Sequence, residues 1–558
     1  MNKRFRSVLI LALFSFLILE SCRSTPQDEF VPLDYTEADV IKNEISTITK
    51  MLETESVKAL WRSSLLQRNS TVENEAISQV LELCSQKVLQ QYQEALKNKN
   101  YLEAHRLLSS LKAVDYPLND ALVEQKQDLD QKILSSVPGY GVPQDSPHAV
   151  SDYISGTVTI WVDLGIHVSR GLGYANRAIG SGFFIDKKGY IITNYHVIQP
   201  EVDPQYEGYS RLYIKLSSDP ETRIPAKVIG WDPLLDLALL KTEIDAPYVF
   251  PLGSSQELDV GERIYAIGSP AGLEWTLTSG IVSAKGRRLL AMGPVMQIDA
   301  AINSGNSGGP IIDEKGNVEA IVFAGMLEYE GLNFAIPVEY LKAQLPILAA
   351  GGLREHGWIG AYGKDAPVDQ FFETPQGLLV QYLMPGGSGQ RSGLSKGDIV
   401  TAVNGVSITG IDDFHNILKT MLAETVVQLS VYSPDSSNGE GAGTEKLLPV
   451  YLEKRPNQPG YEIYQRDLIS NAFLPIFGME LKSATHKNKK SYTVVSVLPG
   501  EIADESGFSV HDPVDIIKIE VPKTKDAIYA QLYTKKRKNG YFEVSLAVGA
   551  PLDSPFYF

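Results

Sequence analysis

Three residues whose types could together form a hydrolytic site lie in separate segments of the middle of the chain: His196, Asp236 and Ser307. A serine hydroxyl is a weak nucleophile at neutral pH, so an imidazole must take its proton as the oxygen attacks a carbonyl carbon. The imidazole later donates that proton to the leaving amine. A buried carboxylate fixes the imidazole tautomer and stabilises its charged form. We therefore expect Ser307 to be the nucleophile, His196 the general base and Asp236 the group that orients it.

Glycines surround the candidate nucleophile in residues 303–310 (NSGNSGGP). They allow the backbone to turn so that the N–H groups of Gly305 and Ser307 point at one oxyanion, and the loss of one such donor typically costs ~2.7–4 kcal/mol. Each candidate residue alone has an ordinary structural interpretation. The order His196, Asp236, Ser307, however, is that of chymotrypsin-like proteases, in which the three side chains come from different loops of a double barrel. The combination predicts the catalytic triad and its oxyanion hole.

The segments that must position these residues have the pattern of a β-rich domain. Residues 155–347 contain short β-branched runs separated by glycine and Asn/Asp turns, which is typical of a barrel or a sandwich. Two further segments, 352–455 and 465–550, mix strands with one or two short helices. A loop rich in glycine and serine is expected at 436–444, between two strands of the first of these segments.

The front of the chain has a different composition. The chain of 558 residues contains 46 glycines, and none precedes Gly139. Glycine is disfavoured inside helices and is common in turns, so its absence favours a helical region. Apolar residues recur at helical spacing from Ile41 to Leu52 and from Ile77 to Tyr92. We therefore predict an all-α domain at 36–134, followed by a linker at 135–154, with Asn100 capping one helix.

The first residues have the organisation of an export signal. Basic residues at 3–6 precede an apolar run at 7–19, which is too short to cross a ~30 Å hydrocarbon core comfortably. The sequence LESC at 19–22 resembles the bacterial lipoprotein box, which implies removal of residues 1–21, a lipid on Cys22 and a tether at 22–35. An ordinary secretory signal with a chance cysteine is the alternative. The first interpretation predicts a protein anchored by lipid to a membrane on the periplasmic side of the cell envelope, and the second a soluble periplasmic or secreted one.

Cysteine number and net charge exclude other classes. Besides Cys22 the sequence holds only Cys84, so a lipidated chain cannot form an intramolecular disulfide, and we expect Cys84 to be a small core residue. The net charge is −16, from 51 basic and 67 acidic residues. Binding to nucleic acid needs a basic surface, so no nucleic-acid partner is expected.

Residues 155–347 resemble the protease domain of the HtrA/Deg family of serine endopeptidases. The resemblance extends through the whole segment and rests on these motifs: GSGF at 180–183, TNYH at 193–196, DLALL at 236–240, IGSPAG at 267–272, TSGIVS at 278–283, QIDAAIN at 297–303 and NFAIP at 333–337. It implies a chymotrypsin-like double β-barrel that cleaves unfolded or damaged exported proteins. It also implies assembly as a homotrimer and chemistry without a cofactor or metal.

The family places PDZ domains behind the protease, and two segments fit that layout. Residues 358–361 (Trp358, Ile359, Gly360 and Ala361) resemble the loop whose backbone amides bind the carboxylate at the end of a peptide. Such a loop is an anion nest beside an open strand edge, to which a peptide adds as a further strand. A structural turn without a ligand is the alternative. The segment 465–550 resembles a second, degenerate PDZ domain, in which His511-Asp512-Pro513 replaces the usual Gly-Asp.

Two functions remain open at this point. The complete triad favours a quality-control endopeptidase of the bacterial envelope. The alternative is a chaperone or a peptide-sensing regulatory module with limited proteolysis of a specific client.

Overall fold

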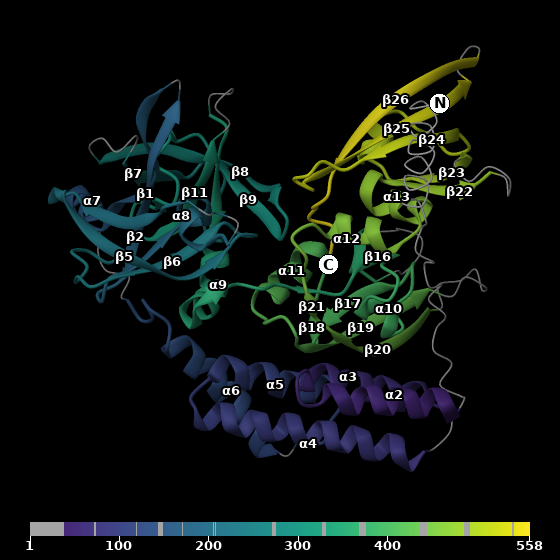
Figure 1. Cartoon of the computed structure of the whole chain (residues 1–558). Helices are drawn as coiled ribbons and strands as arrows, with labels where there is room; N and C mark the ends of the chain where they lie inside the picture. Colours follow the sequence, from purple (N-terminus) through teal and green to yellow (C-terminus); the bar gives the residue numbers. More distant parts are fainter. Residues whose placement is uncertain are drawn as a thin grey trace, which may run out of the picture.

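The computed structural model of the chain describes residues 38–71, 74–118, 120–142, 149–169, 171–204, 206, 208–269, 275–325, 331–367, 375–434, 443–484, 491–537 and 541–558. The described residues form an α-helical domain, a unit of two β-barrels and two smaller α+β domains, which is the predicted architecture. In Figure 1 the helices form a layer along one side of the first α+β domain, and the barrels lie beside both α+β domains.

The helical domain buries one apolar cluster, which includes Cys84. Its helices are α2 (Ala38–Met51), α3 (Ser56–Asn69), α4 (Glu75–Lys97), α5 (Tyr101–Ala113) and α6 (Asp120–Ser135). The Asn100 side chain accepts a hydrogen bond from the Glu103 N–H at 3.3 Å, so the predicted cap of α5 is confirmed. Among the described residues no helix is both long and apolar enough to cross a membrane.

The first barrel holds the segments with His196 and Asp236. Its strands are β1 (Thr157–Ser169), β2 (Leu172–Asp186), β3 (Tyr190–Thr193), β4 (Arg211–Leu216), β5 (Asp219–Asp232) and β6 (Leu237–Thr242). They pair in the order β5-β4-β1-β2-β3-β6, and β5 also pairs with β6, which closes the ring. The short helix α7 (Val150–Ser155) precedes β1, and all but its last residue lies within the range predicted as a linker.

The second barrel holds the loop with Ser307. It is closed in the order β10-β11-β12-β9-β8-β7. Its strands are β7 (Arg263–Gly268), β8 (Thr276–Leu290), β9 (Gly293–Ile298), β10 (Pro310–Ile312), β11 (Val318–Gly325) and β12 (Asn333–Pro337), and helix α9 (Val338–Ala350) follows them. The expected double β-barrel is therefore present.

The first α+β domain contains a sheet in the order β15-β16-β17-β19-β20, with β18 beside β17. Its elements are β14 (Gly357–Trp358), β15 (Ala361–Asp365), β16 (Leu378–Leu383), α10 (Ser388–Arg391), β17 (Ile399–Val403), β18 (Val406–Ser407), α11 (Ile411–Lys419), β19 (Val426–Pro434), β20 (Gly443–Tyr451) and β21 (Glu453–Lys454). The glycine- and serine-rich loop expected at 436–444 falls mainly outside the described residues.

The second α+β domain contains a sheet in the order β22-β23-β24-β25-β26. Its elements are α12 (Pro459–Arg466), α13 (Ile469–Phe477), β22 (Met479–Ser483), β23 (Ser491–Val497), α14 (Ile502–Glu505), β24 (Pro513–Glu520), β25 (Ala527–Arg537) and β26 (Tyr541–Pro551). Its apolar core continues into the first α+β domain through Trp358 and Tyr362. The two domains are therefore packed against each other.

The connection between the barrels and the first α+β domain is itself part of a sheet. Strand β13 (Gly352–Leu353) pairs in parallel with Gly230 and Trp231 at the end of β5. The Arg354 N–H then donates to the Trp231 carbonyl at 2.8 Å. The connector is thus held against the barrel by backbone hydrogen bonds.

Candidate active site

The structure brings His196 and Asp236 into direct contact. His196 lies in the first turn of α8 (Tyr195–Val202), which begins where β3 ends. The Asp236 carboxylate is 2.7 Å from the His196 ring nitrogen Nδ1 and accepts the His196 backbone N–H at 2.8 Å. One carboxylate therefore fixes both the backbone and the ring. The side chain of His196 is 46% exposed.

Asp236 owes its position to a strained turn between β5 and β6. The residue has a φ of 54°, in the left-handed region that few non-glycine residues adopt. The side-chain amide of Asn194 donates to the Asp236 carbonyl at 2.9 Å, and both residues are buried. Such strain persists only where the surrounding contacts determine the conformation. The contacts here are made by residues at the ends of the neighbouring strands.

The Ser307 loop is held against the first barrel by Ser181. The Ser181 N–H donates to the Ser307 carbonyl at 2.8 Å, and its hydroxyl donates to the Gly305 carbonyl at 2.6 Å. A Cβ atom at Gly180 would lie 2.6 Å from the Val197 side chain and 3.1 Å from the Ser307 carbonyl oxygen. Only glycine therefore allows the loop of Ser307 and the helix of His196 to approach β2 at this point.

The backbone around Ser307 leaves donors available. Gly305 and Gly308 have φ values of 107° and 83°. Within the part of the chain that the structure describes, neither the Gly305 nor the Ser307 N–H donates a hydrogen bond to a protein group. Within the same part, no hydrogen bond joins the Ser307 hydroxyl to the His196 ring. Such a bond is often long without a substrate and tightens in the reacting complex.

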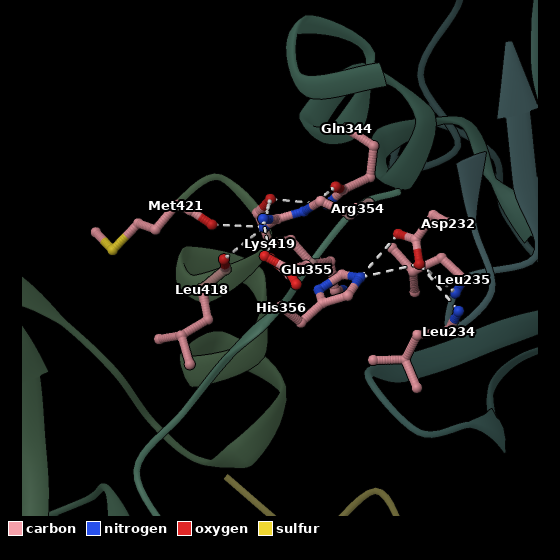
Figure 2. Close-up of polar contacts among 10 residues, drawn as sticks. All are labelled: Asp232, Leu234, Leu235, Gln344, Arg354, Glu355, His356, Leu418, Lys419 and Met421. Atoms are coloured by element: carbon pink, nitrogen blue, oxygen red, sulfur yellow. Dashed lines mark hydrogen bonds and ion pairs between the residues drawn. The ribbon is translucent and has the colours of Figure 1, made fainter. Parts of the chain in front are cut away.

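A buried polar network joins residues 232–235, which directly precede Asp236 in the sequence, to the connector (Figure 2). The carboxylate of Asp232, which is fully buried, accepts the N–H groups of Leu234 and Leu235 at 2.9 and 3.2 Å. His356 Nε2 lies 2.9 Å from both carboxylate oxygens. Burial opposes ionisation of Asp232, but the charges and hydrogen bonds around it hold its pKa below the ordinary value. The Asp236 turn is thus anchored to the connector.

The same network continues into the first α+β domain. Arg354 is buried, and its guanidinium donates to the carbonyls of Lys419 and Met421, at and beyond the end of α11, at 3.2 and 2.5 Å. It also donates to the Gln344 side chain on α9 at 2.9 Å. Burial lowers the pKa of Arg354 to about 10, so the group is charged at neutral pH. Figure 2 shows Arg354 and His356 directed to opposite sides of the connector.

Sequence reasoning missed the network. Asp232 stands in the segment that was identified because of Asp236, but nothing in the local pattern gives it a partner. His356 lies in a polar connector, 124 positions away along the chain, and no motif surrounds it. The useful signal would have been two ionisable residues, Arg354 and His356, placed directly before the segment predicted to bind a carboxylate at 358–361.

The remaining predicted site residues have different outcomes. Trp358, Ile359 and Ala361 are buried, and the backbone of Ala361 is paired with Phe558 of the same chain. Cys22, the candidate lipidation site, lies outside the described residues. Cys84 is buried as expected, and burial raises the pKa of its thiol to about 11, which makes it unreactive at neutral pH. The described residues contain no cluster of three or more potential metal ligands.

Comparison with protein families assigns a domain type to each unit. Residues 180–321 match the trypsin-like peptidase domain, and residues 352–432 match the PDZ domain. Residues 460–552 match the TP0546 family PDZ domain. Residues 39–133 match a domain of unknown function, DUF8517. We refer to the two α+β domains as PDZ1 and PDZ2 below.

Similar curated proteins are bacterial endoproteases. A probable periplasmic serine endoprotease DegP-like from Marinomonas sp. is 35% identical over 291 residues, which are 50% of this chain and 58% of the relative. A protein with the same description from Hahella chejuensis is 39% identical over 241 residues, 42% of this chain and 49% of the relative. The putative serine protease HhoA from Synechocystis sp. is 38% identical over 250 residues, 41% of this chain and 61% of the relative.

These matches cover about half to three fifths of the relatives' lengths. The helical domain and PDZ2 match families of their own. The chain contains a trypsin-like peptidase domain followed by two PDZ domains, and its trypsin-like part is similar to bacterial serine endoproteases.

Proposed function

We propose that the chain is a serine endopeptidase that degrades unfolded or damaged exported proteins in the bacterial cell envelope. The proposal rests on the contacts of the Asp236 carboxylate with both the backbone N–H and the ring of His196. Beside them lies the glycine-rich loop of Ser307, in which the Gly305 and Ser307 N–H groups donate to no group of the described residues. The printed descriptions of the similar proteins, periplasmic serine endoproteases, point to the same class of reaction and the same compartment.

The chemistry follows from the positions of these groups. Asp236 holds the proton of the His196 ring on Nδ1, because its carboxylate is an acceptor only 2.7 Å away. The Nε2 atom is then the basic nitrogen and takes the Ser307 proton as the oxygen attacks the peptide carbonyl. The N–H groups of Gly305 and Ser307 bind the resulting oxyanion. His196 next protonates the leaving amine, and water hydrolyses the acyl-enzyme by the same route.

The test is cleavage of unfolded casein by the full chain and by Ser307→Ala. Loss of the nucleophile is expected to lower the turnover rate by about 10⁴-fold or more. Ser304→Ala is the matched control, because Ser304 is an exposed serine in the same loop. If Ser307→Ala cleaves casein as fast as Ser304→Ala, the assignment of the nucleophile is wrong.

Location and assembly complete the proposal. Cys22 would carry a lipid that holds the protein at a membrane, with the catalytic domain on the periplasmic side. The chain would assemble as a homotrimer. Labelling of cells with a radioactive fatty acid tests the first point, because Cys22→Ser would lose the label. The mass of the purified assembly in solution tests the second.

A further inference from the structure

The segment after β26 adds a strand to the free edge of the PDZ1 sheet. Strand β15 is the edge strand of that sheet, with β16 on its other side. The N–H of Ala361 donates to the Phe558 carbonyl at 2.9 Å, and the N–H of Phe558 donates to the Ala361 carbonyl at 3.0 Å. Two residues further on, the Gly363 N–H donates to the Phe556 carbonyl at 3.1 Å. The pairing is antiparallel, as the bridge between Tyr362 and Tyr557 requires.

The side chain of Phe558 is buried in the groove between β15 and α11. Phe558 is 1% exposed, and its ring meets the Phe414 ring of α11 edge to face at 5.1 Å. His415, also on α11, lies 3.3 Å from the Tyr557 carbonyl. Burial lowers the pKa of His415 to about 3, so the ring is neutral and its Nε2–H can donate to that carbonyl. The segment therefore contacts both walls of the groove.

The loop predicted to bind a carboxylate lies at the end of this groove. Its last residue, Ala361, is the backbone partner of Phe558. Within the described residues, the N–H groups of Ile359 and Gly360 donate no hydrogen bond to a protein group. Two adjacent free amides beside a pocket that takes an aromatic side chain are suited to a peptide that ends in an aromatic residue with a free carboxylate.

Contacts with PDZ2, PDZ1 and the second barrel hold the segment in place. Arg455 makes two hydrogen bonds to the Asp553 carboxylate, at 2.5 and 3.2 Å. The Tyr557 hydroxyl donates to the Pro475 carbonyl in PDZ2 at 2.8 Å. The Phe556 ring is approached by Lys364 at 4.8 Å and by Arg288 of the second barrel at 5.6 Å. Figure 1 places the end of the chain between the α11 and α12 elements.

We propose that residues 553–558 are a built-in occupant of the PDZ1 groove, and that an outside peptide ending in an aromatic residue binds there only by displacing them. A segment tethered by a short connection has an effective concentration of about 1 mM. If a free peptide of this type bound an empty groove with a dissociation constant of about 10 μM, the tethered competitor would weaken its binding about 100-fold. This inference does not depend on proteolysis, since it concerns binding alone.

The experiment measures binding of a fluorescent peptide, SPFYF with a free carboxylate, to the full chain and to Phe558→Asp. The charged side chain cannot enter the apolar pocket, so the variant is expected to bind the peptide at least 10-fold more tightly. Tyr529→Asp is the matched control, because Tyr529 is a 49% exposed aromatic residue on β25. It should bind the peptide like the unaltered chain. Equal affinity in all three proteins, or binding by none of them, would overturn the proposal.

A second measurement needs no substitution. Amide hydrogen exchange of the unaltered chain should show protected N–H groups in Phe558 and β15 without peptide. Saturating SPFYF should expose the amides of residues 553–558 to exchange and leave β15 protected, because the peptide replaces one strand with another. If the segment exchanges freely without peptide, or stays protected at saturation, the proposal is wrong. The same peptide with an amidated end should bind more weakly if the loop at 359–360 takes the carboxylate.

Discussion

Replacement of His356 by leucine should loosen the turn that carries Asp236. The change removes the hydrogen-bonding partner of a fully buried carboxylate, Asp232, and leaves the charge in place. Loss of a hydrogen bond to a charged group typically costs about 1.5–3 kcal/mol. At about 1.4 kcal/mol per factor of ten, the opening equilibrium of the turn should rise about 10- to 150-fold. The Leu234 and Leu235 amides report this directly, since both donate to Asp232.

The assay is amide hydrogen exchange at those two leucines, together with the rate of casein cleavage. Asp236 orients His196, and a displacement of about 1 Å at a catalytic group can lower a rate about 100-fold. Cleavage by His356→Leu should therefore fall while remote strands, such as those of PDZ2, keep their protection. The effect is local because Asp232 hydrogen-bonds the turn itself.

A double variant isolates the physical reason. Asp232→Asn combined with His356→Leu keeps an oxygen that accepts the two amides but removes the charge. With the charge removed, only an uncharged hydrogen bond of about 1 kcal/mol is missing, so the Leu234 and Leu235 amides should regain most of their protection from exchange. If the double variant exchanges as fast as His356→Leu alone, the unpaired charge is not the cause. If His356→Leu exchanges like the unaltered chain, the connector does not hold the turn.

Three further changes test other parts of the structure. Burial lowers the pKa of Lys419 to about 7, so between pH 7 and 10.5 this side chain is protonated in the unfolded chain but not in the folded one. The free energy of unfolding measured in urea should therefore rise with pH in this window, relative to that of Lys419→Met, by at most about 1.4 kcal/mol per pH unit. The Trp61 ring N–H donates to the Pro449 carbonyl at 3.0 Å, and the ring stacks on that of Tyr451 with centroids 5.6 Å apart. Trp61→Ala should therefore weaken the packing of the helical domain on PDZ1 by about 3–5 kcal/mol. Limited proteolysis should then release the helical domain. Gly308 has a φ of 83°, and a Cβ atom there would lie 2.4 Å from the Ser181 carbonyl oxygen. Gly308→Ala should therefore abolish casein cleavage with little change in the circular dichroism spectrum. Normal cleavage by this variant would contradict the geometry.

Sequence reasoning reached the fold and the candidate triad because both are encoded locally. The alternation of β-branched runs and turns marks strands wherever they pair, and Asp236 precedes a buried strand, LALL, in its own segment. Glycine at 305 and 308 marks backbone that needs a positive φ, which the structure contains. Such patterns can be recognised in the sequence without knowledge of tertiary contacts.

The contacts between domains could not be predicted in this way. His356 and Asp232 are 124 positions apart, and His415 and Tyr557 are 142 positions apart. The segment SPFYF has no periodicity, so nothing in its sequence distinguishes a strand in a groove from an exposed tail. Which residues meet across domain boundaries is decided by packing of whole domains, and one sequence alone does not contain that information in local form.

The pairing of β13 with β5 has a consequence for how the length of the chain can vary. A free linker tolerates an added residue, since each doubling of a flexible loop costs only about 0.6 kcal/mol. Here an insertion between Gly352 and Arg354 would move Arg354 and His356 out of register with Trp231 and Asp232. The connector therefore fixes the spacing between the barrel and PDZ1, and homologous chains that keep this pairing should vary in its side chains before they vary in its length.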